Sequence, residues 1–497
     1  FINVLEKCQN ESLIVLSGCG TSGRIAFLLV TSFNEMLKAQ KQKQICSYII
    51  AGGDRALLTS QEAPEDDPAL GARTLDKICA GKKHVLFIGI SCGMSAPFVA
   101  GQLDFCLKHL DVFTPVLLGF NPVHMAREPM QDCSFHFKDV AERMAAEQRH
   151  KKAFVLNPVL GAEAISGSSR MKGGSATKII LESILLAGHE ATFRGKRTTP
   201  EFCHNQRHTY DFFFCKSFIS LQMNAHVYYI GWQTLGTIGL TDASECVPTY
   251  GADFDDIRGF INNGFREMKN KEGDLSFLGP EFIIGHKDFV ETILPSLSQN
   301  DMMLFLFAVN DDLHEVTALA DQVRRRTSNL HAIAHDLEKF IIPVNFKESS
   351  FQQRQRWELS TKWCLNAIST GAHVLKGKVY MNYMIDLRVT NSKLYRRAIS
   401  ILQRFTGCSK SKCERALLRA IYSTDDLSED MASVDVWKHT DAVVPTALVM
   451  MQCGCTLAEA RHHLDCHPVI RDAVSACFNS SKTKNFIKPL DSVESEP

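Results

Sequence analysis

The chain has 497 residues, which is too long for a single hydrophobic core and predicts two or three domains. Lysine and arginine together number 55, as do aspartate and glutamate, so no overall field attracts nucleic acid or an anionic membrane. No apolar run approaches the roughly 20 residues that span a bilayer. The 17 scattered cysteines fit reduced thiols better than a disulfide framework.

Residues 1–195 alternate short apolar strands with helical patterns. This alternation is typical of a doubly wound α/β domain with a parallel sheet. The expected strands are Leu13–Leu16, Cys46–Ile50, Val85–Ile88, Pro115–Leu118 and Phe154–Leu156.

The first strand leads into Ser17–Arg24, a loop of glycines and hydroxyl side chains, and then into the helical pattern Ile25–Leu37. Glycine permits a sharp backbone bend, and the N–H groups at the start of a helix bind anions. The same loop fits the dinucleotide-binding pattern, which needs an acid after the second strand. The first acid there is Asp54, which is late for that spacing. The loop therefore predicts a phosphate site of either kind.

Two further loops, Gly89–Ser95 and Ser166–Lys172, carry hydroxyl side chains and precede the helical patterns Ala96–Leu107 and Ala176–Leu186. The first of them follows a strand, as Ser17–Arg24 does, and ligands bind at such strand ends in open parallel sheets. A nucleotide pyrophosphate needs one such cradle, whereas a phosphate with several sugar hydroxyls uses three. The set of loops favours a sugar phosphate.

A polar linker, Arg194–His204, separates this domain from a second α/β pattern at 205–375. The second pattern begins with the helix His208–Asn224, ends with the helix Trp357–Thr370, and has four expected strands: His226–Ile230, Phe282–Ile284, Leu304–Ala308 and Ala332–Ala334. Residues 376–497 are helical and poor in strands, which predicts an all-helical cap: Lys393–Phe405, Lys412–Tyr422 and Thr456–Leu464.

The two α/β halves form a pseudo-repeat. When Gly18 is aligned with Gly231, Gly23 falls on Gly236 and Ser32 falls on Glu245. The second copy lacks phosphate chemistry, because Trp232 and Gln233 fill its glycine loop and Asn310-Asp311-Asp312 replaces the hydroxyl side chains. Carboxylates at a helix start suit the helix dipole but repel phosphate. One functional and one degenerate site are expected.

The three hydroxyl-rich loops resemble those of the sugar isomerase (SIS) domain family, which binds sugar phosphates. The N-acetylmuramic acid 6-phosphate etherases are similar in particular at Ser17–Arg24, Ala51–Gly53, Glu62–Asp66 and Gly167–Lys178, and in the segment from Gly377 to Ser409. Two SIS domains followed by such a cap resemble the glucokinase regulatory protein family. The resemblance implies a protein that binds and inhibits glucokinase, with fructose 6-phosphate strengthening the complex and fructose 1-phosphate weakening it at one site.

The resemblance to the etherases also implies a loss of catalysis. A glutamate of those enzymes acts in proton transfer together with the glutamate matching Glu65, and it falls on Ser32 here. A serine hydroxyl needs an activating partner to act as a general base, and losing such a group costs roughly 10²–10⁴-fold in rate. The second repeat keeps a glutamate at Glu245, which we interpret as a relic. We therefore expect a regulatory protein with no catalytic residues, although an etherase or isomerase using Glu65 and Glu245 stays an alternative.

The candidate sugar-phosphate ligands are positions in the three loops, one carboxylate from the acidic turn, and one lysine that matches Lys178 in the pseudo-repeat. They are Gly20, Thr21, Ser22, Glu65, Ser91, Cys92, Gly93, Ser95, Ser168, Ser169 and Lys362. Ordinary helix capping is the alternative for the serines and threonines, and a surface lysine is the alternative for Lys362.

No metal or cofactor is expected. The cluster His462-His463 with Cys466 and His467 lacks the second pair of ligands that zinc sites draw on. The surface that meets glucokinase is not visible in the sequence; Phe340–Pro343 is the one candidate named, and a buried strand is the alternative there. Cytoplasmic and nuclear residence is implied by the resemblance alone. Because the chain begins at Phe1, we expect residues to be missing before it.

Overall fold

The computed structural model describes residues 11–61, 63–126, 136–194, 225–335, 350–389, 392–427, 442–467 and 469–480. The chain forms two compact units. The first comprises residues 1–247 and 253–372, and the second comprises residues 248–252 and 373–497. The expected helix His208–Asn224 and the segment Phe340–Pro343 lie outside the described residues.

The first α/β domain is built on a five-stranded parallel sheet in the order β2-β1-β3-β4-β5. Its strands are nearly continuous apolar runs because helices cover both faces of such a sheet. They are β1 (Ser12–Gly18), β2 (Cys46–Ile50), β3 (His84–Ile90), β4 (Phe113–Leu118) and β5 (Phe154–Leu156). All five expected strands are therefore confirmed.

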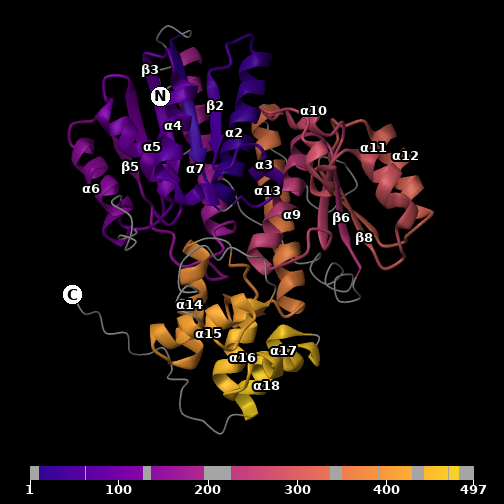
Figure 1. Ribbon diagram of the computed structural model, residues 1–497. Helices are drawn as coiled ribbons and strands as arrows, with labels where there is room; N and C mark the ends of the chain where they lie inside the picture. Colours follow the sequence, from indigo (N-terminus) through magenta and orange to yellow (C-terminus); the bar gives the residue numbers. More distant parts are fainter. Residues whose placement is uncertain are drawn as a thin grey trace. The chain divides into compact units, whose positions relative to one another are not determined.

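Helices alternate with these strands (Figure 1). They are α2 (Gly20–Ala39), α3 (Arg55–Leu58), η1 (Ala63–Asp66), α4 (Pro68–Cys79), α5 (Pro97–Lys108), η2 (Val123–Met125), α6 (Phe137–Gln148) and α7 (Lys172–Arg194). Helix α2 starts five residues earlier than the predicted Ile25, so the glycine loop itself supplies its first turn. Proline stands at the first helical position of α4 and of α5, where its missing N–H costs nothing.

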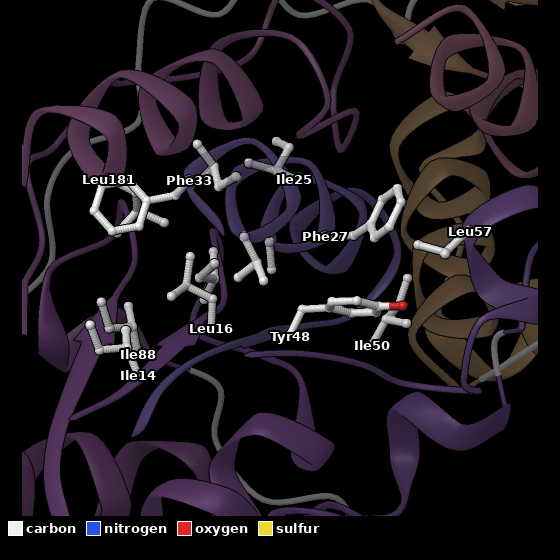
Figure 2. Close-up of a cluster of buried hydrophobic side chains, with 14 of the residues drawn as sticks. Ile14, Leu16, Ile25, Phe27, Phe33, Tyr48, Ile50, Leu57, Ile88 and Leu181 are labelled. Carbon is white, nitrogen blue, oxygen red and sulfur yellow. The ribbon is translucent and has the colours of Figure 1, made fainter. Parts of the chain in front are cut away.

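A large buried cluster covers one face of this sheet and continues into the second α/β domain, where Leu240 and Ile261 belong to it. Figure 2 shows its side chains from β1, β2, β3, α2 and α7, including Leu16, Phe27, Ile88 and Leu181. The rings of Phe27 and Tyr48 meet edge to face with their centroids 5.1 Å apart. This apolar packing fixes α2, and with it the glycine loop, against the sheet.

The second α/β domain repeats the pattern with four parallel strands in the order β7-β6-β8-β9. The strands are β6 (Val227–Gly231), β7 (Ile257–Ile261), β8 (Met302–Ala308) and β9 (Leu330–His335). Its helical elements are α9 (Gln233–Tyr250), α10 (Phe265–Met268), η4 (Ser276–Leu278), η5 (Pro280–Phe282), α11 (His286–Asp288), η6 (Phe289–Ile293), η7 (Leu294–Ser296), α12 (Leu313–Arg324) and α13 (Ser350–Leu375).

One expected strand of this domain is wrong and one strand was missed. Within Phe282–Ile284, Phe282 ends the 3₁₀ turn η5 and the other two residues form no strand. The carbonyl oxygen of Ile284 accepts a hydrogen bond from the backbone N–H of Ile261 at 2.8 Å, and Gly285 after it forms an isolated bridge with Ile261. The actual edge strand is β7, whose Arg258 and Gly259 interrupt the apolar run. The guanidinium carbon of Arg258 lies 5.1 Å from the centre of the Phe260 ring, and the charge is paired with Asp255 at 3.3 Å, so this arginine is accommodated in the strand.

Polar groups join the two α/β domains beside β2. Asp54 accepts hydrogen bonds from the backbone N–H of Glu272 at 2.6 Å, the amide of Asn270 at 3.1 Å, and the hydroxyl of Tyr48 at 2.7 Å. The ammonium of Lys271 lies 4.3 Å from the centre of the Tyr48 ring. The two domains of the first unit therefore share a built contact.

The second unit is helical, as expected, with a short hairpin of β10 (Val379–Tyr380) and β11 (Tyr383–Met384). Its helices are α14 (Ser392–Thr406), α15 (Lys410–Tyr422), α16 (Val443–Cys453), α17 (Leu457–Asp465) and α18 (Ile470–Ser480). Helix α16 was not predicted, because it is apolar on all sides and has no amphipathic period.

Among the described residues, no single helix has the length and apolar character needed to cross a membrane. The helices α16 and α17 pass that test only as a pair, and they are bent by 113°.

Candidate functional site

Two of the predicted loops start where the strand order of the first sheet reverses. Strands β1 and β3 are parallel neighbours, with Gly18 level with Ile90, and the chain leaves them toward opposite sides of the sheet. Open α/β sheets bind ligands in the crevice at the carboxyl ends of such strands. The fold therefore gives the loops after β1 and β3 a position suited to a ligand.

The glycine loop lies beside the predicted carboxylate. A Cβ placed on Gly20, whose φ is +48°, would be 3.4 Å from Glu65 Oε1. Glu65 is only 6% exposed and lies on η1. The N-cap of α2, Cys19, makes no side-chain cap hydrogen bond, so the dipole of this helix start is not offset by a capping side chain there. The structure thus brings the acidic turn to the first loop.

Cys92 is a meeting point of the second loop, the first loop and α7. Its sulfur lies 3.6 Å from Ser22 Oγ and 3.9 Å from Thr177 Oγ1. Burial raises the pKa of this thiol, so it stays protonated at neutral pH. The cluster therefore offers neutral donors rather than a thiolate that would repel an anion.

Ser91 holds the end of the second loop ahead of α5, which itself has no side-chain cap. Its Oγ accepts hydrogen bonds from the backbone N–H of Ser95 at 3.1 Å and of Ala96 at 3.4 Å. A serine hydroxyl that accepts two hydrogen bonds still has its own hydrogen to donate. These hydrogen bonds within the loop and ligand binding are therefore compatible at Ser91, and exposed Gly93 lies two residues further along the loop.

The third loop reaches the first through α7. A Cβ on Gly174 would lie 3.3 Å from Thr21 Cγ2 and 3.4 Å from the carbonyl oxygen of Ser169. Ser168 is 4% exposed, and its hydroxyl has no hydrogen-bond partner within the described parts of the chain. A buried hydroxyl without a partner costs about 1–3 kcal/mol, which a bound ligand would offset.

Glu163, which the sequence analysis did not name, holds the start of α7 beside the third loop. Its carboxylate accepts the backbone N–H groups of Lys172 at 2.9 Å and Gly173 at 2.7 Å. The first amides of α7 are therefore already capped by a carboxylate. The glutamate lies nine residues before the helix in an irregular segment, so no capping pattern signals it.

Lys362 is engaged by the protein itself. Its ammonium donates to the carbonyl oxygen of Arg170 at 2.6 Å and to Asn366 Oδ1 at 2.6 Å. Burial lowers the pKa of Lys362 to about 8, against the opposing effect of Glu245. The predicted surface alternative is wrong, since the side chain is buried behind the third loop.

Glu245 is carried by α9 to the first domain. Its carboxylate oxygens lie 4.0 Å from the guanidinium groups of Arg24 and Arg170. Arg170 also contacts Asp242 Oδ1 at 3.3 Å. Ser32, the residue of the first repeat that aligns with Glu245, donates a hydrogen bond to Glu358 at 3.5 Å. The acidic position of the second repeat thus forms part of a buried charge network between the domains.

The degenerate copy has filled its own anion cradle. The backbone N–H of Gln233 donates to Asn262 Oδ1 at 2.9 Å, and the Gln233 amide donates to Asp311 at 2.7 Å. Asp312 accepts the backbone N–H groups of His314 and Glu315 at the start of α12. The amides that would meet a phosphate are already bonded, so the geometry agrees with the predicted loss.

A second buried cluster joins α7 to α13. The ammonium of Lys178, with no exposed surface, contacts the carboxylates of Glu182 and Glu358, the latter at 3.0 Å. Burial raises the pKa of Glu182 to about 7; Lys178 opposes this shift and Glu358 adds to it. The cluster holds one more acid than base.

This cluster predicts a pH dependence of stability. The folded-state pKa of Glu182 lies above its unfolded value, so its contribution is full below about pH 4.5 and is lost as the pH rises to about 7. Relative to Glu182→Gln, the native chain is expected to lose about 1 to 3 kcal/mol of unfolding free energy over this window. Urea denaturation at several pH values measures this difference. The exposed variant Glu291→Gln is the control, and parallel curves for Glu182→Gln and the native chain would contradict the assignment.

Among the described residues, no group of three or more His, Cys, Asp or Glu side chains is arranged to hold a metal ion.

Three family models match successive parts of the chain. The N-terminal SIS domain of glucokinase regulatory protein matches residues 1–107, the second SIS domain matches residues 213–376, and the C-terminal lid domain matches residues 381–474. These matches confirm the expected fold class, two SIS domains followed by a helical region.

Curated relatives extend over nearly the whole chain. The glucokinase regulatory protein of Xenopus laevis is 44% identical over 95% of this chain and 83% of its own length. The human protein of the same name is 43% identical over 98% of this chain and 84% of its own length. An N-acetylmuramic acid 6-phosphate etherase of Aeromonas hydrophila is 29% identical over 48% of this chain and 73% of its own length. With its fold, its paired SIS domains and these relatives, the chain belongs to the glucokinase regulatory protein family.

Proposed function

We propose that this chain binds and inhibits glucokinase, and that a sugar phosphate in the first SIS domain controls the strength of the inhibition. The names of its relatives support glucokinase as the partner. Membership of this family makes the chain a regulator rather than an enzyme.

The observation that carries the ligand proposal is the convergence of neutral donors at the point where the first sheet reverses its strand order. Ser22, Cys92 and Thr177 come from three separate segments, and the Cys92 sulfur lies 3.6 Å from Ser22 Oγ and 3.9 Å from Thr177 Oγ1. Backbone amides and hydroxyl groups bind a phosphate without a neighbouring cation, as helix starts do elsewhere. The proposed ligands are the eleven residues named from the sequence, with Lys362 acting through the carbonyl group of Arg170.

Glu65 is the proposed contact for the sugar hydroxyls. It is buried beside Gly20, so a ligand in the glycine loop would meet its carboxylate. A carboxylate accepts hydrogen bonds from hydroxyl groups and repels a phosphate. The pair of loop and carboxylate therefore orients a phosphosugar, with its phosphate toward the amides and its hydroxyl groups toward Glu65.

Opposite effects of two ligands require two conformations. Fructose 6-phosphate strengthens inhibition in this proposal and fructose 1-phosphate relieves it, which is possible at one site only if each favours a different conformation. Couplings of this kind are typically worth about 1–3 kcal/mol. The two sugars would share the phosphate contacts and place their rings differently.

The position of Glu245 disfavours the alternative of an active etherase or isomerase. Glu245 is 3% exposed and faces the guanidinium groups of Arg24 and Arg170, and Ser32 supplies no carboxylate. Turnover of N-acetylmuramic acid 6-phosphate or fructose 6-phosphate that is lost in Glu65→Gln would overturn the regulatory proposal.

The test is glucokinase activity with this chain and increasing fructose 1-phosphate. Ser22→Ala removes one donor, and we expect it to raise the concentration of fructose 1-phosphate needed for release by about fivefold or more. Thr234→Ala, at the position of the second repeat aligned with Thr21, is the matched control and should leave release unchanged. If both variants raised the concentration of fructose 1-phosphate equally, or if Ser22→Ala left it unchanged, the ligand would not bind at the first loop.

We propose action without a cofactor, in the cytoplasm and the nucleus, as the family resemblance suggests. Fluorescence microscopy of the tagged chain tests the location, and the absence of a nuclear signal would exclude residence in the nucleus.

A further inference from the structure

The second SIS domain contains a cavity of about 690 Å³ that the proposed function does not use. Its walls come from the segment after β7, the segment that leads into α11, and helix α12. Polar side chains line much of it, among them Asn263, Asp274, His286, Asp288 and Glu315. A cavity of this size is in the range of small-molecule sites.

His286 presents a buried hydrogen-bond acceptor. Its Nε2 lies 3.0 Å from the carbonyl oxygen of Gly231, which only accepts, so Nε2 carries the hydrogen. Burial lowers the pKa of His286 to about 4, which leaves the ring neutral at pH 7 and Nδ1 with a lone pair. His286 is 7% exposed, and Nδ1 has no hydrogen-bond partner within the described residues.

Glu315 places a second acceptor opposite the first. Its Oε1 lies 3.8 Å from His286 Nδ1, while its Oε2 accepts a hydrogen bond from the indole N–H of Trp232 at 3.1 Å. Trp232 is buried and meets the His286 ring edge to face, so both acceptors are held in position. Two facing acceptors with no hydrogen between them need a donor from outside the chain.

We propose that this cavity binds a neutral polyhydroxyl compound, a sugar or polyol, with hydroxyl groups donating to His286 Nδ1 and Glu315 Oε1. Adjacent hydroxyl groups of a polyol are spaced to reach both acceptors. A phosphate is disfavoured, because three carboxylates line the cavity against two cations, Arg266 and Lys287, and Lys287 is paired with Glu291 at 3.7 Å. The proposal is independent of the phosphosugar site in the first domain.

Calorimetric titration of the full chain with sorbitol and with myo-inositol tests this site. We expect saturable binding of at least one of them. Glu315→Gln should weaken it by about tenfold or more, since the amide nitrogen of glutamine would itself donate to His286 Nδ1. Glu315 is half-exposed, so this variant is expected to fold. His286→Phe removes the other acceptor and should also weaken the binding of the polyol.

Two controls separate this site from the proposed function. Glu291→Gln, an exposed carboxylate outside the cavity, should leave sorbitol binding unchanged. Ser22→Ala should weaken the binding of fructose 1-phosphate and leave the binding of sorbitol unchanged. No saturable binding up to the solubility of either polyol would mean that only water bridges the acceptors, and would overturn the proposal. Binding that survives Glu315→Gln, or binding of ethanolamine in preference to both polyols, would overturn it equally.

Discussion

Arg170→Met is expected to lower the free energy of unfolding by about 3 to 5 kcal/mol, as is usual when one member of a buried ion pair is removed. Arg170 is 2% exposed and donates to Ser369 Oγ at 2.7 Å and Thr370 Oγ1 at 3.1 Å. Its guanidinium also faces the buried carboxylates of Asp242 and Glu245. Without it, two negative charges stay buried with less compensation.

Urea denaturation of the full chain measures this loss. Arg324→Met is the matched control, because Arg324 pairs with Asp321 at 3.1 Å on the surface, with both side chains more than half exposed. Exposed pairs contribute about 0–1 kcal/mol. A loss for Arg170→Met as small as that of the control would mean that the network does not hold the two domains together.

Gly23→Ala is expected to destabilise the chain by about 1 to 3 kcal/mol through overpacking and to weaken fructose 1-phosphate binding by tenfold or more (about 1.4 kcal/mol). A Cβ on Gly23 would lie 2.5 Å from Ile50 Cγ1 and 2.8 Å from the carbonyl oxygen of Gly18. Because the carbonyl group belongs to the backbone, α2 must move away from the sheet. The donors of the glycine loop move with it.

Gly236→Ala in the second repeat is an unusually close control. A Cβ there would lie 2.7 Å from Ile261 Cγ1 and 2.8 Å from the carbonyl oxygen of Gly231, which is nearly the same collision. Both variants should lose similar stability in thermal denaturation, whereas only Gly23→Ala should lose fructose 1-phosphate affinity in calorimetry. If both variants lost fructose 1-phosphate affinity equally, the ligand would bind elsewhere, or the loss would result from general destabilisation.

The sequence predicted the sheets well where strands are continuous apolar runs. All five strands of the first domain and the alignment of Gly23 with Gly236 came from local pattern alone, because buried parallel strands and close helix–strand contacts restrict residue type. Strand β7 was not predicted, since Arg258 and Gly259 break its apolar run. Helix α16 was not predicted either, because it has no polar face and so shows no amphipathic pattern.

The candidate site was predicted in its loops but not in its contacts. The hydroxyl-rich loops are local features, so Ser22 and Ser91 could be named as candidates from composition and position. The capping of α7 by Glu163 and the pairing of Glu245 with Arg24 join segments far apart in the chain or outside any motif. Such contacts depend on how the two domains pack, and no spacing in a single sequence encodes that packing.

The contacts between the repeats, from Asp54 with Glu272 to Arg170 with Asp242, join two halves of one polypeptide. Two separate SIS chains would form such an interface only above their dissociation constant. Covalent connection replaces that requirement with a fixed effective concentration. The interface, and any response that depends on it, is therefore expected to be insensitive to dilution of the protein.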